Sequence, residues 1–309
     1  MIKAADKVVK TCLGIKPNEK ILIVTDTKMQ KIGKVIYEAA KKISKNSSLI
    51  VMQPTGRDGK EPSKIVARAI KKSDKVIAPT YYSLTHTQAA IRAWKKGVII
   101  ATMPHVSEFS FTKGGLTANY KVVYRFCKKM LRHVRNARTV KVTSPSGTDV
   151  EFSAKGREWN NDEGIFGRRH KLGNLPAGEV FVAPVEGSVN GRIVFDSFEL
   201  SRGKIELEVK NGKVFRMRGD IKKLEKIFSK LGKKARQVAE FGIGCNPKAR
   251  VIKNTLEDEK VFGTVHIALG NNTGFGGKNK VEFHQDGIIL KPTLIVDGRI
   301  IIRNGKWLI

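Results

Sequence analysis

The sequence predicts two domains: an α/β domain with a mostly parallel sheet over residues 1–138, and an α+β, β-rich domain over residues 139–309. From residue 20 onward, short runs of Val and Ile alternate with segments of helical periodicity, such as KILIVTD, KIGKVIYEAAKKISK and SLIVMQP. Near residue 138 this alternation gives way to successive strands joined by hairpin turns. A chain of 309 residues with 40% apolar content is long enough to fill two cores.

The strands of the first half read as near-continuous apolar runs, as in KVIAPT and VIIATMP. Such runs indicate strands that are buried on both faces, as in a parallel sheet covered by helices. The segment after the first strand, VTDTKMQKIGK, lacks the glycines that bring a backbone close to a pyrophosphate. Dinucleotide binding is therefore not expected.

His86 lies at the start of the predicted helix THTQAAIRAWKKG, at the edge of the sheet where α/β domains bind ligands. A simpler interpretation is that Thr85 or Thr87 caps this helix through its hydroxyl. His86 is therefore not a candidate site residue.

The second half reads as strands with defined turns. TVKVTSPSGTDVEFSA predicts a hairpin around a Ser-Pro-Ser-Gly turn, and two further hairpins are expected at Asn211-Gly212 and Asp297-Gly298. One helix, from Asp220 to about Phe241, interrupts the strands. Its apolar residues recur at helical spacing, which predicts that it packs on the sheet.

The formal net charge of +31, from 59 basic and 28 acidic residues, raises the question of nucleic-acid binding. The basic residues are spread along the whole chain, and no recognition motif accompanies them. In the densest basic segment, Arg125 to Arg138, the apolar residues recur at helical spacing, which indicates a helix with a buried stripe and a solvated basic face. A nucleic-acid partner is therefore not expected.

Neither a membrane nor a secretory role is indicated. No apolar stretch approaches the roughly 20 residues that a membrane span requires, and the Lys-rich N-terminus has no apolar core typical of a signal peptide. Three scattered cysteines, Cys12, Cys127 and Cys245, are too few for a disulfide framework or a structural zinc site. We expect a cytoplasmic protein.

The candidate metal-binding residues lie in the second half of the sequence, in the segments GTVHIALG and VEFHQDGIIL. Strand alternation places His284 and Asp286 on one face of a strand, and His266 lies in another strand-like segment eighteen residues earlier. Taken alone, each histidine is better explained as a surface or core residue that makes an ordinary hydrogen bond. Together, two imidazoles and one carboxylate form the smallest donor set for zinc, cobalt or non-haem iron with positions left open for substrate.

Two carboxylates in apolar surroundings add to this set. Glu179 precedes an apolar run in NLPAGEVFVAP, and Glu240 lies in VAEFGIGC, where the predicted helix gives way to a strand. Each is also consistent with a charge at the end of a strand or helix. Burying a carboxylate without a partner is costly, however, and a bound cation removes that cost. Glu186, in APVEGSVNG, reads as a turn residue that could at most support the ligands.

The order NLPAGEVFVAP, AEFGIG, GTVHIALG and HQDG resembles the thermophilic aminopeptidase T family of metallopeptidases. The resemblance implies an α/β domain followed by a β-rich domain, a homodimer, and two metal ions such as Zn, Co or Mn. It implies five metal ligands: Glu179, Glu240, His266, His284 and Asp286. It is specific for residues 172–290 and only architectural for the first domain.

The implied activity is an aminopeptidase, in which a metal-activated water attacks a peptide carbonyl and Glu179 or Glu240 passes the proton to the leaving amine. One feature departs from the family, because NNTGFGGKNK offers Phe275 where these peptidases have a Tyr. The same superfamily looks to include a dihydroxypyridine ring-cleaving dioxygenase, in which His266, His284 and Asp286 would hold a single Fe(II). That dioxygenase, acting on a small-molecule substrate, is the alternative, and a catalytically altered metal-binding homologue is the third possibility. Glu179 and Glu240 decide between one metal ion and two.

Overall fold

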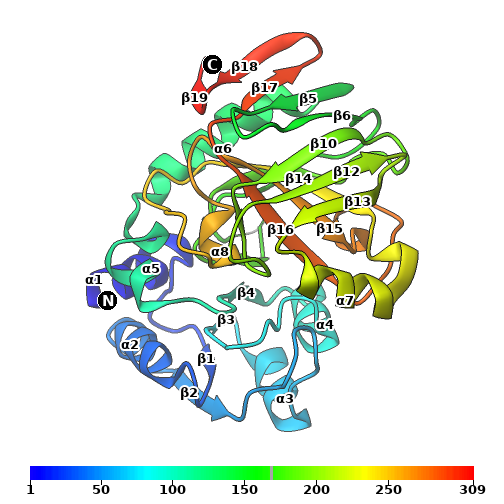
Figure 1. Ribbon diagram of the computed structural model, residues 1–309. Coiled ribbons are helices and arrows are strands. Elements are labelled where there is room, and N and C mark those ends of the chain that lie inside the picture. Colours follow the sequence, from blue (N-terminus) through cyan, green and yellow to red (C-terminus); the bar gives the residue numbers. More distant parts are fainter. Residues whose placement is uncertain (168–169) are drawn as a thin grey trace. The chain divides into compact units, whose positions relative to one another are not determined.

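The computed structural model describes residues 1–167 and 170–309 (Figure 1). The chain forms two compact units, and each unit draws on separate parts of the sequence. Unit 1 consists of Met1–Tyr124, Asp162–Ala177 and Pro247–Ala249; unit 2 consists of Arg125–Asn161, Gly178–Asn246 and Arg250–Ile309. The division at residues 138/139 stays a prediction about separate folding domains. Among the described residues, no helix is both long and apolar enough to cross a bilayer.

Unit 1 contains the predicted parallel sheet. Its strand order is β2-β1-β3-β4-β8, and every neighbouring pair is parallel. The strands are β1 (Ile21–Asp26), β2 (Ser47–Met52), β3 (Lys75–Ala78), β4 (Ile99–Thr102) and β8 (Leu172–Asn174). All residues of β1 and β3 are buried, as the continuous apolar runs predicted. The last strand, β8, comes from a segment some seventy residues after β4 in the chain.

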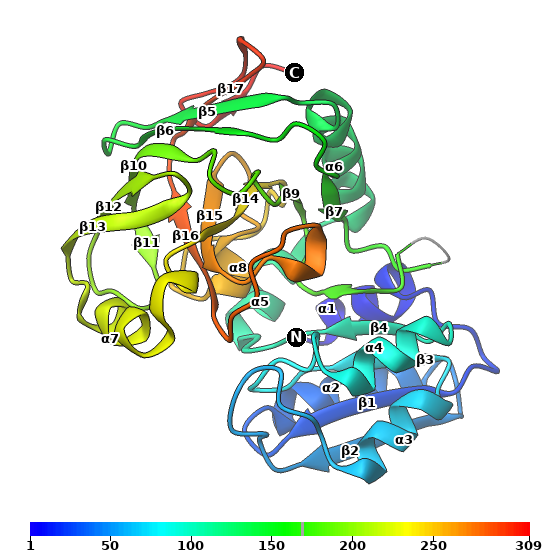
Figure 2. The ribbon, with the colours of Figure 1, turned by 90° about the vertical axis from the view of Figure 1, so that its right-hand side faces the viewer.

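Helices cover both faces of this sheet (Figures 1 and 2), with α2 on one side of the strands and α3 with α4 on the other. The helical segments of unit 1 are α1 (Ile2–Lys7), η1 (Val8–Cys12), α2 (Gln30–Lys41), α3 (Lys64–Lys72), α4 (Gln88–Lys95), α5 (Glu108–Thr112) and η2 (Gly115–Thr117). On the α3 and α4 side, Val66, Ile70 and Ala90 pack in one core cluster with the strands. Thr87 accepts a hydrogen bond from the amide of Ala90, which confirms it as the cap of α4.

The larger sheet of unit 2 is antiparallel and has the order β13-β12-β10-β6-β5-β17-β18-β19. Its strands are β5 (Thr139–Thr143), β6 (Asp149–Ser153), β10 (Asn190–Phe195), β12 (Ile205–Lys210), β13 (Lys213–Gly219), β17 (Thr293–Val296), β18 (Arg299–Arg303) and β19 (Lys306–Trp307). All three predicted hairpins are present. The turn residues Asn211 and Gly212 have φ values of 52° and 75°, the left-handed backbone that two-residue hairpin turns require.

The second sheet of unit 2 has six strands in the order β11-β16-β15-β14-β9-β7. Its strands are β7 (Asn160–Asp162), β9 (Glu179–Val182), β11 (Ser197–Phe198), β14 (Val238–Gly244), β15 (Val265–Gly270) and β16 (His284–Ile289). Figures 1 and 2 both show β14, β15 and β16 side by side. Every residue of β14 and β15 is buried, and Phe241 packs against Phe152 and Trp159 with ring centroids 5.1 and 6.1 Å apart.

The helices of the second half differ from the prediction in one place. The basic segment forms α6 (Tyr120–Val134), with Met130 and Val134 fully buried, as its periodicity indicated. The next helix was expected to reach about Phe241, but α7 (Lys222–Leu231) ends at Leu231 and is followed by η3 (Gly232–Lys234). Gly232 adopts a φ of 70°, which ends the helix. Two short segments, α8 (Thr255–Asp258) and η4 (Thr273–Phe275), complete the unit.

Candidate metal centre

The predicted ligands lie on one face of four neighbouring strands, β16, β15, β14 and β9. His266 pairs with Gly242 across β15 and β14, and Ala268 pairs with both Glu240 and Asp286. Directly opposed residues of antiparallel strands point to the same face, and so do residues two apart on one strand. The register therefore places Glu179, Glu240, His266, His284 and Asp286 on a common face.

Small residues make room for these side chains. The positions between the ligands on this face are Gly242, Gly244, Ala268 and Gly270. A Cβ atom at Gly242 would lie 2.0 Å from Nε2 of His266, so the imidazole occupies the space that any other residue would fill. The glycines of AEFGIG thus leave a recess in the sheet face for the side chains of the neighbouring strands.

The five side chains form a connected set of close contacts. Nε2 of His266 lies 3.3 Å from Oε2 of Glu179 and 3.6 Å from Oε1 of Glu240. Nε2 of His284 lies 3.4 Å from Oε2 of Glu240 and 3.6 Å from Oδ2 of Asp286. Glu240 thus directs one oxygen to each imidazole.

These contacts define two groups that could each hold a metal ion. The first is Glu179, Glu240 and His266, and the second is Glu240, His284 and Asp286; within each group the ligand atoms lie within 4.8 Å of one another. The two imidazoles belong to different groups, and Glu240 joins them. The two-histidine, one-aspartate triad expected from the sequence is thus drawn from both groups.

The protonation of the cluster reflects crowding of carboxylates around two imidazoles. Burial would lower the pKa of His266, but the adjacent carboxylates of Glu179 and Glu240 raise it well above its ordinary value. Burial likewise opposes the charge on His284, yet Asp286 and Glu240 raise its pKa to about 10. Burial would raise the pKa of Glu240, but the two histidines lower it to about 2. The cluster therefore stabilises positive charge at its centre.

Several buried polar atoms of this cluster make no hydrogen bond to any described residue. They are both ring nitrogens of His266, Oε2 of Glu179 and Oδ1 of Asp286. Buried polar atoms are nearly always hydrogen-bonded, and an imidazole and carboxylates that lie close together without forming hydrogen bonds are donors that a divalent ion can bind. The donor set therefore fits a metal ion, and its chemistry suits Zn(II) and Fe(II) alike.

Metal binding is expected to release protons. The pKa of His284 is raised to about 10, and that of His266 is also raised. In the metal-free protein at neutral pH both imidazoles are therefore protonated on both ring nitrogens and positively charged. A metal ion binds neutral imidazole, so binding displaces these protons and affinity increases with pH. Calorimetric titration at pH 7 in buffers of different ionisation enthalpy should show release of about one or more protons per metal ion. No dependence on the buffer would contradict the raised pKa values.

A loop beside β16 orients His284. Nδ1 of His284 donates a hydrogen bond to the carbonyl oxygen of Asn271 over 2.8 Å, which leaves Nε2 directed at the carboxylates. The ring of Phe275, in η4 of the same loop, lies 6.0 Å from the His284 ring and 5.6 Å from that of Phe181. The His284 side chain remains 33% exposed, whereas His266 is fully buried. The open side of the cluster is therefore the side of His284.

Glu186 anchors this loop. Its Oε1 accepts hydrogen bonds from the amide of Lys278 over 2.7 Å and from the side chain of Asn272 over 3.3 Å. Its Oε2 pairs with Arg157, which also donates to the carbonyl oxygen of Gly276. Glu186 thus supports the site by holding the loop that carries Phe275.

Two charged residues of the cluster were not found from the sequence. Lys260 pairs with both Glu179 and Glu259, and the Lys260 side chain is fully buried. In the sequence they belong to LEDEKVFG, a charged segment that reads as a solvated turn. No local signal distinguishes a buried lysine in such a segment from an exposed one.

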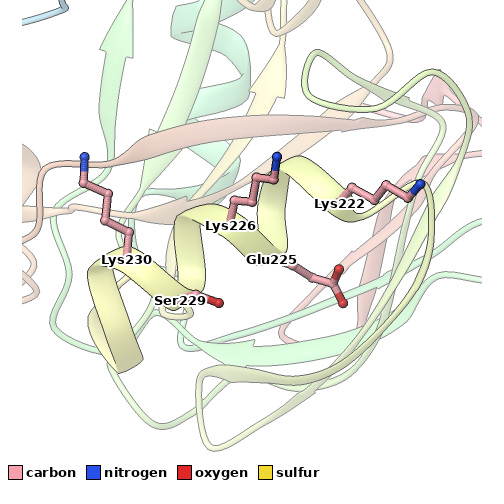
Figure 3. Close-up of a pocket in the computed structure, with 5 residues that line it drawn as sticks. All are labelled: Lys222, Glu225, Lys226, Ser229 and Lys230. Carbon is pink, nitrogen blue, oxygen red and sulfur yellow. The ribbon is translucent and has the colours of Figure 1, made fainter.

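A surface pocket on α7 is not formed by the candidate metal ligands. It is lined by Lys222, Glu225, Lys226, Ser229 and Lys230 (Figure 3), which all lie on one short helix. Figure 3 shows Lys226 and Lys230 extending to the same side of the helix. This lining is the solvated face of an amphipathic helix, and it includes no member of the two ligand groups.

Two solved structures share the fold of this chain. The 2,5-dihydroxypyridine dioxygenase from Pseudomonas putida KT2440 has a TM-score of 0.79 and 16% identity, over 99% of this chain and 96% of that chain. Wild-type AmpT from Thermus thermophilus, an aminopeptidase T, has a TM-score of 0.75 and 17% identity, over 100% of this chain and 98% of that chain. At these identities the likeness shows the fold alone.

A family assignment comes from the sequence comparisons. A search of curated proteins gives no match. The model of one protein family, described as NicX: 2,5-dihydroxypyridine 5,6-dioxygenase, matches residues 1–309. The match covers the whole chain, including the strands that carry the clustered histidines and carboxylates, and it shows that the protein belongs to the NicX family of 2,5-dihydroxypyridine 5,6-dioxygenases.

Proposed function

We propose that this protein is a mononuclear non-haem Fe(II) dioxygenase that cleaves a dihydroxylated pyridine ring. The observation that carries the proposal is the family match over residues 1–309. The donor set supports it, because two histidines and an aspartate are the usual ligands of Fe(II) in such oxygenases. The aminopeptidase expected first from the sequence is the less favoured candidate.

Under this proposal His266, His284 and Asp286 would hold Fe(II), which when bound would bring the ring hydroxyl and molecular oxygen together for reaction. The remaining residues bind and orient the substrate. Glu240, whose pKa of about 2 keeps it ionised, offers an oxygen beside His284 that can accept a hydrogen bond from a ring hydroxyl. The backbone carbonyl of Asn271 keeps Nδ1 of His284 protonated, so that Nε2 is the nitrogen available as a ligand.

Phe275 is placed to contact the aromatic ring of the substrate. It lies at the exposed side of the cluster, edge-on to His284 and next to Phe181. Replacing Phe275 with Ala is expected to raise KM for the pyridine about 3- to 10-fold, the size of one lost aromatic contact, without changing the bound metal. Steady-state kinetics and metal analysis test this. The matched control is Phe215→Ala, which removes an aromatic side chain that is 58% exposed on β13; equal effects of the two changes would contradict the assignment.

The proposal is tested by oxygen uptake. Metal-free protein is loaded anaerobically with Fe(II) or Zn(II), and 2,5-dihydroxypyridine is added in an oxygen-electrode cell. We expect substrate-dependent uptake with Fe(II) alone, together with loss of the pyridine absorbance. Uptake that is equal in the iron-loaded and metal-free protein would overturn the proposal.

One observation favours the aminopeptidase as a second candidate. The two ligand groups share Glu240, as a bridging carboxylate does in a two-metal centre. An aminopeptidase would use Zn, Co or Mn, with Glu179 as a further ligand. Release of amino acids from a panel of dipeptides and amino-acid amides by protein loaded with these metals would support it, and failure to cut the whole panel would remove it.

A further inference from the structure

One loop carries two groups that contact the most exposed candidate ligand. The loop runs from Asn271 to Phe283 and connects β15 to β16. Near its start, the carbonyl oxygen of Asn271 accepts the hydrogen bond from Nδ1 of His284 over 2.8 Å. Further along, the ring centroid of Phe275 lies 6.0 Å from that of His284. The conformation of this loop therefore sets both the orientation of the imidazole and the position of the aromatic ring beside it.

Two asparagines tie the arms of this loop together. The amide of Asn272 donates to the carbonyl oxygen of Asn279 over 3.1 Å, and the amide of Asn279 donates to Oδ1 of Asn272 over 2.8 Å. The side chain of Asn279 also donates to the carbonyl oxygen of Gly270 over 2.6 Å. Asn272 is fully buried, and a Cβ at Gly277 would lie 2.0 Å from its Cγ. The packing and the hydrogen bonds thus specify one conformation of the loop.

An arginine and a glutamate from other parts of unit 2 hold the loop from outside. Arg157 precedes β7 and Glu186 follows β9. The Arg157 guanidinium donates both to Oε2 of Glu186 and to the carbonyl oxygen of Gly276, and its side chain is only 13% exposed. Oε1 of Glu186 accepts hydrogen bonds from the side chain of Asn272 and from the amide of Lys278. The pair therefore fixes the loop on both sides of its aromatic residue.

We propose that Arg157 is a positioning residue of the metal centre, which acts through Glu186 and this loop to fix the imidazole of His284 and the ring of Phe275 together. His284 needs such support, because its side chain is 33% exposed whereas that of His266 is fully buried. A guanidinium suits the task, since its planar fork donates to two acceptors in fixed directions. The proposal rests on the proposed function for the substrate contact of Phe275, but its effect on metal binding does not depend on the reaction.

Loss of the guanidinium should have two linked effects. In Arg157→Met we expect metal affinity to decrease about 10- to 100-fold, the usual effect of removing a group that orients a metal ligand. We also expect KM for 2,5-dihydroxypyridine to increase about 3- to 10-fold or more, because Phe275 moves with the loop. The visible spectrum of the Co(II)-loaded protein should change as the His284 nitrogen is displaced. Phe275→Ala, by contrast, should increase KM and leave metal affinity and the spectrum unchanged.

A buried lysine of unit 1 provides the matched control. The side chain of Lys75, in β3, is 7% exposed and pairs with Glu19 over 2.8 Å. It also donates to the carbonyl oxygen of Gly14 over 2.8 Å. Lys75→Met therefore removes a buried base that binds one carboxylate and one backbone carbonyl, as Arg157→Met does. Lys75 lies on a strand that contributes no residue to the ligand groups, so metal affinity and the Co(II) spectrum should stay unchanged.

The experiment is a Co(II) titration of the metal-free proteins, followed by visible absorption, with circular dichroism to confirm folding. A folded Arg157→Met that has the metal affinity and the Co(II) spectrum of the unaltered protein would overturn the proposal. So would an equal loss of affinity in Lys75→Met, which would reduce the effect to one of general stability. If Arg157→Met does not fold, Glu186→Gln replaces it under the same criteria, since its amide oxygen can still accept from the loop. Absence of oxygen uptake by the unaltered protein would remove the proposed function and leave the Co(II) comparison decisive.

Discussion

Replacing His284 with Ala or Asp286 with Asn should abolish activity and weaken metal binding by more than about 100-fold. Even residues that only hold a ligand in place typically contribute ~10- to 100-fold to metal affinity, and these two supply donor atoms themselves. Both lie on β16, and both belong to the ligand group on the open side of the cluster. The fold should survive, because the pairing of β16 with β15 and β11 is made by backbone atoms and does not depend on either side chain. Titration with Co(II) and oxygen uptake with Fe(II) measure the two effects.

The control for these variants lies between them on the same strand. Gln285 points to the opposite face, where its side-chain amide donates to the hydroxyl of Thr255 over 2.8 Å. Gln285→Ala should therefore keep metal affinity and activity within a few-fold of the unaltered protein. A His284→Ala protein that binds metal as the unaltered protein does would refute the site.

The second large effect is expected at a residue that contributes no donor atom. Gly242→Val should disrupt the metal centre, because a Cβ at this position would lie 2.0 Å from Nε2 of His266. Gly242 lies in the middle of β14 and directly opposes His266, so a side chain at position 242 would push the imidazole out of the recess or force β14 away from β15. We expect loss of measurable metal binding and a decrease of about 1–3 kcal/mol or more in the free energy of unfolding, as for other overpacked interiors.

Denaturant unfolding and metal titration test the Gly242 prediction, with Gly203→Ala as the control. A Cβ at Gly203 would meet no atom within 4 Å, so this change should leave both measurements unchanged. Normal metal binding by Gly242→Val would mean that His266 is not held in the recess between β14 and β15.

Much of the fold follows from local patterns in the sequence. The parallel sheet of unit 1 and the three hairpins of unit 2 were predicted because apolar runs and turn residues are local signals. The end of α7 was missed because the apolar periodicity continued through Gly232 into residues that form β14. The addition of β8 to the parallel sheet was also missed, since it depends on pairing with β4 across some seventy residues.

The residues of the centre were predictable, but their grouping was not. Strand alternation placed His284 and Asp286 together, and the position of Glu179 and Glu240 in apolar segments pointed to a bound cation. Only the register of β9, β14, β15 and β16 shows that the two histidines fall into different groups joined by Glu240. Lys260 could not be found at all, because its burial results from the packing of a turn against β14 and not from its local sequence.

The central claim is that this centre inserts both atoms of molecular oxygen into a dihydroxylated pyridine ring. Ring cleavage by a dioxygenase adds one O₂ to the substrate, so the product has the composition of the substrate plus two oxygen atoms. We therefore propose a single-turnover reaction of the Fe(II)-loaded protein with 2,5-dihydroxypyridine under ¹⁸O₂, with the product examined by mass spectrometry. The account predicts an open-chain product that carries two ¹⁸O atoms. An open-chain product without ¹⁸O, or unchanged pyridine after full loading with iron, would contradict it.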